Sequence, residues 1–163
     1  MKRLLIVYHS LTGGTRQMAE AAAAGASTEP NIGVRLLEAG AAGPDDVLHA
    51  SAYIFATPEN LAAMSGRMKD FFDRTYYPVL DRINGRAYVT LVCAGSDVTS
   101  ATRQIARIAT GWRLRSVADP LIVCTRAQTP EAILAPKTMN ANDLARCHDS
   151  GKTLAAGLAM GIF

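Results

Sequence analysis

The feature of this sequence that most constrains its fold is a regular alternation of short apolar runs with segments of helical periodicity. The runs expected to form strands are residues 3–8, 33–38, 52–56, 88–93 and 121–124. Helices are expected over residues 15–26, from Pro44 onward, and where apolar positions recur within 64–75, 101–112 and 144–158. Such alternation is typical of βαβ units, in which helices cover both faces of a parallel sheet. The sequence therefore predicts an α/β fold, a three-layer doubly wound five-stranded parallel sheet.

Length and composition indicate a single domain over residues 1–163. The chain is 49% hydrophobic and 19% charged, which is typical of a globular protein rather than a disordered one. Its net charge of +3 is small and its arginines are scattered, so composition gives little support to nucleic-acid binding. No apolar stretch approaches the ~20 residues that span a bilayer. We therefore expect no membrane insertion and a cytoplasmic location.

The three cysteines, Cys93, Cys124 and Cys147, are far apart in the sequence. Their odd number and their spacing fit neither a disulfide framework nor a zinc site. We therefore expect free thiols and no metal site.

Ligands of a doubly wound sheet bind at the carboxyl ends of its strands, so the segments that follow the strands are the candidate binding loops. These segments are residues 9–15, 57–64, 94–99 and 125–139. The last of them is long for a loop in a compact domain, which makes it a candidate functional insertion.

The first of these loops, HSLTGGT, has the residue types of a phosphate site. Helix N-termini offer unpaired N–H groups and a partial positive charge, and glycines let the backbone curl around an anion. Hydroxyl groups add donors without bulk. The candidate cradle consists of Ser10, Thr12, Gly13, Gly14 and Thr15. The alternative is an ordinary strand-to-helix turn with Thr15 as the N-cap residue.

Three motifs together resemble the flavodoxin superfamily. The pattern Ser10-x-Thr12-Gly13-x-Thr15 resembles its phosphate-binding fingerprint. Thr57-Pro58-Glu59-Asn60, followed by Met64-Ser65-Gly66-Arg67-Met68, resembles the loop of NAD(P)H:quinone oxidoreductases of the tryptophan-repressor-binding-protein type, to which the NADPH-dependent FMN reductases are related. Cys93-Ala94-Gly95-Ser96-Asp97 occupies the position at which the superfamily closes over the flavin ring. The resemblance implies FMN as cofactor and the strand order 2-1-3-4-5.

The resemblance also implies which residues contact FMN. The phosphate loop comprises Ser10, Leu11, Thr12, Gly13, Gly14 and Thr15. The residues along the isoalloxazine ring are Thr57, Pro58, Glu59, Asn60 and Leu61. Those on the pyrimidine side of the ring are Ala94, Gly95, Ser96 and Asp97. No side chain stands out as a general acid or base, so no catalytic residue is assigned.

The implied activity is transfer of a hydride from NAD(P)H to FMN, and then of electrons to a quinone or similar small acceptor. Electron-carrier flavodoxins commonly stack aromatic rings on FMN and are acidic. Residues 57–64 and 94–99 contain no aromatic residue, and this chain is mildly basic. Both features favour a two-electron reductase over a one-electron carrier, which stays an alternative. Another alternative is a flavodoxin-fold protein without flavin that binds a different phosphate ligand or a protein.

An uncovered flavin face leads us to expect a homo-oligomer, with active sites near the subunit contacts. One segment for such a contact is residues 125–139, through Ile133 and Leu134. Another is a Tyr76-Tyr77-Pro78 turn, because tyrosines provide large, stiff contact area. The alternative is that both segments pack on their own domain.

Overall fold

A computed structural model describes residues 1–96 and 99–163 of the chain. The main strands are β1 (Lys2–Tyr8), β2 (Ile32–Glu38), β3 (Ala52–Asn60), β5 (Ala87–Ala94) and β7 (Leu121–Cys124). They pair in parallel in the order β2-β1-β3-β5, and β7 adds to the free edge of β5. The predicted α/β fold is therefore confirmed, with β5 and β7 as the fourth and fifth of the expected strands.

The sheet also contains two short strands that the sequence does not predict. β4 (Ala63–Met64) pairs antiparallel with the end of β3. Residues 57–60 therefore continue a strand instead of forming a loop, and Met64 precedes the next helix instead of starting it. β6 (Arg115–Ser116) pairs with the beginning of β5, ahead of β7. Pro120 lies between β6 and β7 and has no N–H to donate to a sheet, which accounts for the interruption of this edge.

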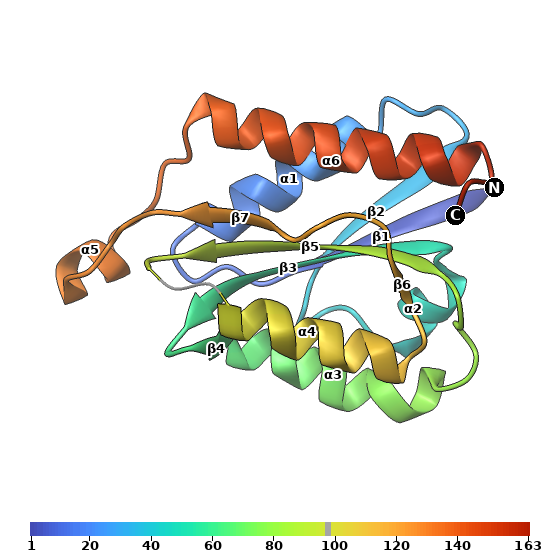
Figure 1. Cartoon of the computed structure of the whole chain (residues 1–163), viewed down its shortest axis with the longest axis horizontal. Helices are drawn as coiled ribbons and strands as arrows, with labels where there is room; N and C mark the ends of the chain where they lie inside the picture. The colour runs from blue at the N-terminus through green and yellow to red at the C-terminus, as the bar shows by residue number, and fades with distance from the viewer. Residues whose placement is uncertain (97–98) are drawn as a thin grey trace.

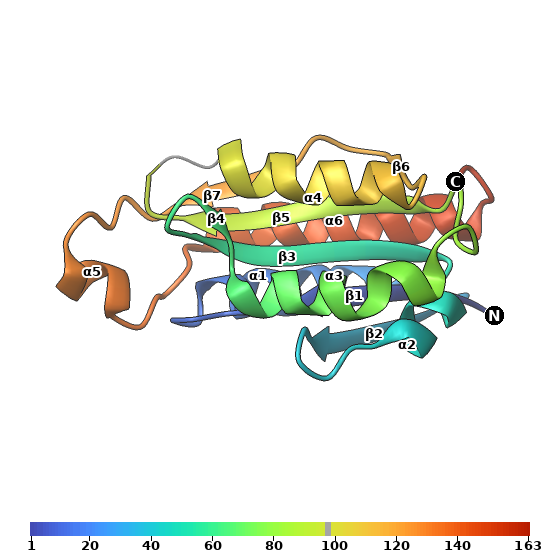
Figure 2. The ribbon, with the colours of Figure 1, turned by 90° about the horizontal axis from the view of Figure 1, so that it is seen from below.

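Helices cover both faces of the sheet (Figures 1 and 2). On one face lie α1 (Gly14–Ala26) and α6 (Ala141–Ala159), and on the other α2 (Pro44–His49), α3 (Gly66–Val79) and α4 (Thr99–Gly111). Met18 and Leu154 belong to the core of the first face, and Phe71 and Trp112 to the core of the second. The domain thus has the three layers that the sequence predicts.

The packing of α1 against α6 depends on two glycines. A Cβ atom added to Gly25 would collide with the carbonyl oxygen of His148, and one added to Gly151 would collide with that of Ala22. Any side chain at either position would push the helices apart. This contact fixes the direction of α1, whose first two residues belong to the candidate phosphate loop.

The two segments considered for subunit contacts both carry exposed side chains: Ile133 is 45% exposed, Leu134 66% and Tyr77 78%. Residues 125–139 contain the short helix α5 (Pro130–Leu134), which extends beyond the carboxyl ends of the strands, at the end of the molecule away from both termini (Figure 1). Tyr76, Tyr77 and Pro78 form the last turn of α3 and not a turn between elements. The Tyr76 ring stacks on Trp112, whose indole nitrogen donates to the Tyr76 carbonyl at 3.0 Å. None of the helices in the described part of the chain is long and apolar enough to cross a membrane.

Candidate functional site

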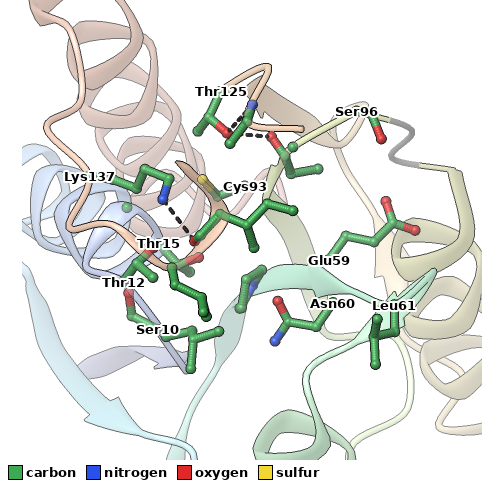
Figure 3. A pocket seen from close by; sticks show the side chains of 18 of the residues that line it. Ser10, Thr12, Thr15, Glu59, Asn60, Leu61, Cys93, Ser96, Thr125 and Lys137 are labelled. Atoms are coloured by element: carbon green, nitrogen blue, oxygen red, sulfur yellow. Dashed lines mark hydrogen bonds between the residues drawn. The ribbon is translucent and has the colours of Figure 1, made fainter. Parts of the chain in front are cut away.

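A cavity of about 500 Å³ opens at the carboxyl ends of the parallel strands (Figure 3). Pockets for small ligands and cofactors have volumes of ~300–1,000 Å³. Most of the residues predicted from the sequence line this cavity: Ser10, Leu11, Thr12, Gly14, Thr15, Pro58, Glu59, Asn60, Leu61, Ala94, Gly95 and Ser96. The doubly wound topology brings these three loops together, although they are far apart in the sequence.

Two predicted site residues in the described part of the chain, Gly13 and Thr57, do not line the cavity. Gly13, within the first loop, is the N-cap residue of α1 and lines a neighbouring cavity instead. Thr57 is fully buried, and its hydroxyl accepts from the Ser65 N–H at 3.1 Å and donates to the Pro58 carbonyl at 2.9 Å. It therefore ties the end of β3 to the start of α3 instead of facing a ligand. Asp97 lies outside the described residues.

The first loop leaves the start of α1 without a side-chain cap. Gly13 has a φ of 95°, a left-handed conformation that favours glycine. Its N–H donates to the Ser10 hydroxyl at 3.0 Å, and the first helical hydrogen bond runs from Gln17 N–H to the Gly13 carbonyl. The N–H groups of the first helical turn have no partner within the helix. Thr15 is consequently not the N-cap residue, and the alternative of a turn capped by Thr15 is wrong.

Thr15 carries an unusual buried hydroxyl group. The residue is only 1% exposed, and its Oγ1 atom has no hydrogen-bond partner among the described residues. A buried hydroxyl without a partner costs about 1–3 kcal/mol, so native proteins rarely retain one without a reason. Because Thr15 lines the cavity, a ligand with acceptor atoms would supply the missing partner.

A tight hairpin between β3 and β4 forms the second side of the cavity. Its two central residues, Leu61 and Ala62, have φ values of 50° and 60°. Two-residue hairpins normally place Asn or Gly at such positions, so this turn is strained. The Leu61 side chain is completely exposed at the cavity mouth.

Glu59 lies deeper on the same side. Its Oε1 atom accepts from the backbone N–H of Ala101, in the first turn of α4, at 3.1 Å. A carboxylate is favourable there because of the positive end of the helix dipole. The other oxygen, Oε2, is buried and has no partner among the described residues. It is therefore an acceptor without a partner, buried in the wall of the cavity.

The third side of the cavity consists of the end of β5 and the chain that follows β7. A Cβ atom on Gly95 would lie 2.6 Å from the carbonyl oxygen of Ala127, so the close approach of these segments requires glycine. The Thr125 N–H donates to the Ala94 carbonyl at 2.7 Å. Burial raises the pKa of the neighbouring Cys93 thiol to about 11, so Cys93 is an un-ionised packing residue.

Seven further residues that line the cavity are not among those predicted from the sequence. They are Ala62, Cys93, Thr125, Ala127, Ile133, Leu134 and Lys137. The length of the 125–139 segment is the signal that could have found the last five of them. Lys137 and Glu59 are the charged residues that line the cavity within the described part of the chain. Also within that part, no group of three or more His, Cys, Asp or Glu side chains could hold a metal ion.

No family model matches the chain. Among the curated proteins of similar sequence, one is named a flavodoxin and another an NAD(P)H dehydrogenase (quinone). The chain is 34% identical to a flavodoxin from Aquifex aeolicus, over 60% of this chain and 50% of that protein. It is 38% identical to an NAD(P)H dehydrogenase (quinone) from Acidithiobacillus ferrooxidans, over 46% of this chain and 48% of that protein. The chain spans about half the length of these curated relatives.

Solved structures match the chain over almost its entire length. A flavodoxin from the domain Archaea has a TM-score of 0.78 at 19% identity, covering 96% of this chain and 99% of that one. A flavodoxin, WrbA-like protein from Agrobacterium tumefaciens has a TM-score of 0.69 at 19% identity, covering 98% and 99%. At these identities the likeness establishes the fold, and it is the fold that the resemblance implies.

Proposed function

On the premise that this chain has the flavodoxin-like fold, we propose that its cavity binds FMN and that the protein is a flavin oxidoreductase. The phosphate would bind in the loop of residues 10–15, with NAD(P)H as electron donor and a quinone or similar small molecule as acceptor. When bound, FMN supplies the redox chemistry by taking up a hydride and passing electrons on. The protein binds and orients the reactants.

The observation that carries this proposal is the unpaired Thr15 hydroxyl at the uncapped start of α1. A phosphate group accepts hydrogen bonds and is favoured by the dipole at a helix N-terminus. The first loop offers such a group the N–H groups of the first turn and the hydroxyls of Thr12 and Thr15. A phosphate ester therefore satisfies donors that are costly to leave unpaired.

The remainder of the cavity suits a flat ring with polar edges. Pro58, Leu61 and Ala94 provide apolar contacts, and the free Oε2 atom of Glu59 accepts from a ligand N–H. The amide of Asn60 can both donate and accept. Among the described residues, these features support the assignments that the resemblance implies, apart from Thr57 and Gly13.

The choice of a two-electron reductase over a carrier rests on the composition of the cavity wall. No aromatic residue of the described chain lines it, so no side-chain ring from this part of the protein stacks on the ligand. A second planar substrate can then approach an uncovered face. The relative named flavodoxin from Aquifex aeolicus favours the second candidate, a one-electron carrier.

Rapid mixing of the FMN-loaded protein with NADH or NADPH under anaerobic conditions separates these candidates. For a reductase we expect the flavin absorbance to bleach with at least one nicotinamide, faster than for free FMN, and to return when a water-soluble quinone is added. Bound FMN that resists both nicotinamides yet is reduced by dithionite would identify a carrier. If the protein binds no FMN, the remaining alternative is a flavodoxin-fold protein that binds a different phosphate ligand or a protein.

A further inference from the structure

The backbone of Lys137 is fixed against the first loop, although the two are far apart in the sequence. Its N–H donates to the Thr12 carbonyl at 2.9 Å, and its carbonyl accepts from the Gln17 side chain at 2.7 Å. The same Gln17 amide accepts from the Met139 N–H at 3.1 Å. A Cβ atom on Gly14, the first residue of α1, would lie 3.5 Å from the Cβ of Lys137. Lys137 is thereby held beside the start of α1.

The ammonium group of Lys137 is attached to α5. Nζ donates to the carbonyls of Ala132, Ile133 and Ala135 at 2.7, 3.0 and 2.6 Å. These are carbonyls at the end of a short helix, where a cation is favourable. An ammonium has three N–H donors, and all three are directed to neutral oxygens.

Charge is distributed unevenly across the cavity. Lys137 lies on the same side as the labelled hydroxyls of Thr12 and Thr15, and Glu59 lies across from them (Figure 3). The nearby Arg16 is more than half exposed and pairs with Glu20 at 3.7 Å on the outer face of α1. Lys137 is therefore the cation within the described cavity wall that lies beside the candidate phosphate loop.

We propose that Lys137 is a phosphate-binding residue whose Nζ turns from the α5 carbonyls to the phosphate of the bound ligand. The proposal rests on the proposed function. A phosphate monoester carries a charge of about −1.5 to −2 at neutral pH, and a charge-assisted hydrogen bond to it is stronger than one to a neutral carbonyl. The backbone is fixed, but the four-carbon stem of lysine is flexible, so the exchange requires only side-chain rotation. Lys137 thus links the ligand phosphate to α5.

The test compares FMN with riboflavin, which has the same ring and ribityl chain but no phosphate. Dissociation constants for both are measured by flavin fluorescence in the wild type and in Lys137→Met. We expect the variant to bind FMN about tenfold to a hundredfold more weakly, because a charge-assisted hydrogen bond is lost. Riboflavin affinity should stay within about twofold. The salt dependence of FMN binding should also decrease, because one screened charge pair is gone.

Three further variants separate the charge of Lys137 from its effect on α5. Lys137→Arg retains a cation and should retain most FMN affinity. Thr129→Ala removes the side-chain cap of α5, whose hydroxyl accepts from the Ala132 N–H at 3.2 Å, without changing any charge, and should bind FMN normally. Lys152→Met removes an exposed lysine of α6 and should also bind FMN normally. Circular dichroism confirms folding of each variant.

Two outcomes would overturn the assignment of Lys137. One is wild-type FMN affinity and salt dependence in Lys137→Met. The other is a loss of FMN affinity in Lys137→Met that is matched by an equal loss of riboflavin affinity, or that Thr129→Ala reproduces. Either result would show that the order of α5 alone affects binding. If the wild type binds no FMN, the proposed function itself fails, and the Lys137 proposal fails with it.

Discussion

The Thr15 hydroxyl gives the clearest single-residue test, because it is buried without a partner in the protein alone. Thr15→Val keeps the shape of the side chain and removes the hydroxyl. We expect the ligand-free variant to be more stable by about 1 kcal/mol, since an unpaired buried polar group is lost. FMN affinity should fall about tenfold. Urea unfolding and FMN titration measure the two effects.

A matched control for this substitution is Thr75→Val. Thr75 is also fully buried, but its hydroxyl donates to the Phe71 carbonyl and it does not line the cavity. This variant should gain no stability and should bind FMN as the wild type does. Equal stability changes at the two positions would mean that the Thr15 hydroxyl is not unpaired.

His9, beside the first loop, predicts a pH dependence of stability. Burial, and then the positive charge of Arg67, lowers its pKa from the ordinary value. The unfolded chain therefore binds a proton more readily than the folded one, and this disfavours folding at acid pH. The contribution of neutral His9 is complete above about pH 6.5 and is lost as the pH falls through the lowered pKa. His9→Gln removes this contribution.

Thermal unfolding of the wild type and His9→Gln between about pH 7.5 and 5.0 tests this dependence, since the range starts above the ordinary pKa of histidine, ~6.5. The wild type should lose stability relative to the variant as the pH falls. A constant difference in Tm across that range would contradict the lowered pKa.

At the scale of elements, the contact between α1 and α6 is the one most sensitive to a single methyl group. Gly151→Ala places a Cβ against the backbone of Ala22, which side-chain rotation cannot relieve. We expect a loss of about 1–3 kcal/mol or more in the free energy of unfolding, the cost of overpacking. Since α1 presents the phosphate loop, FMN affinity should fall as well.

The control for this prediction is Gly66→Ala at the start of α3. A Cβ there has nothing within 4 Å, and the backbone is not left-handed. Alanine restricts the unfolded chain more than glycine, so we expect a gain of about 0.4–1 kcal/mol. Urea unfolding of both variants checks the pair, and a Gly151→Ala protein as stable as the wild type would contradict the described packing.

The β3–β4 hairpin shows why some elements were beyond prediction. The main strands stand out in the sequence as short apolar runs, and the helices as apolar positions that recur about every 3.6 residues. The hairpin has no such signal: Pro58 argues against a continuing strand, and Leu61-Ala62 lacks the Asn or Gly typical of its turn. Contacts with α4 help to hold it, among them the bonds from Met64 N–H to the Gln104 side chain and from Ala101 N–H to Glu59.

For the whole molecule, the sequence locates the cavity because parallel strands deliver their following loops to one edge. Lys137 could not be found in the same way. A single lysine within the long 125–139 segment has no characteristic spacing, and its position depends on Thr12 and Gln17, more than a hundred residues earlier.

Association of the whole molecule into a homo-oligomer stays a prediction. Light scattering of the FMN-loaded protein tests it, and a mass near 17.3 kDa, that of one chain, would reject it.

The central claim is that this cavity binds FMN through its phosphate. The most direct measurement is a titration of the flavin-free protein with FMN, followed by the visible absorption and fluorescence of the flavin. We expect a shifted spectrum that saturates at one FMN per chain, and much weaker binding of riboflavin. A flavin spectrum unchanged by excess protein, or riboflavin binding as tight as that of FMN, would contradict the account.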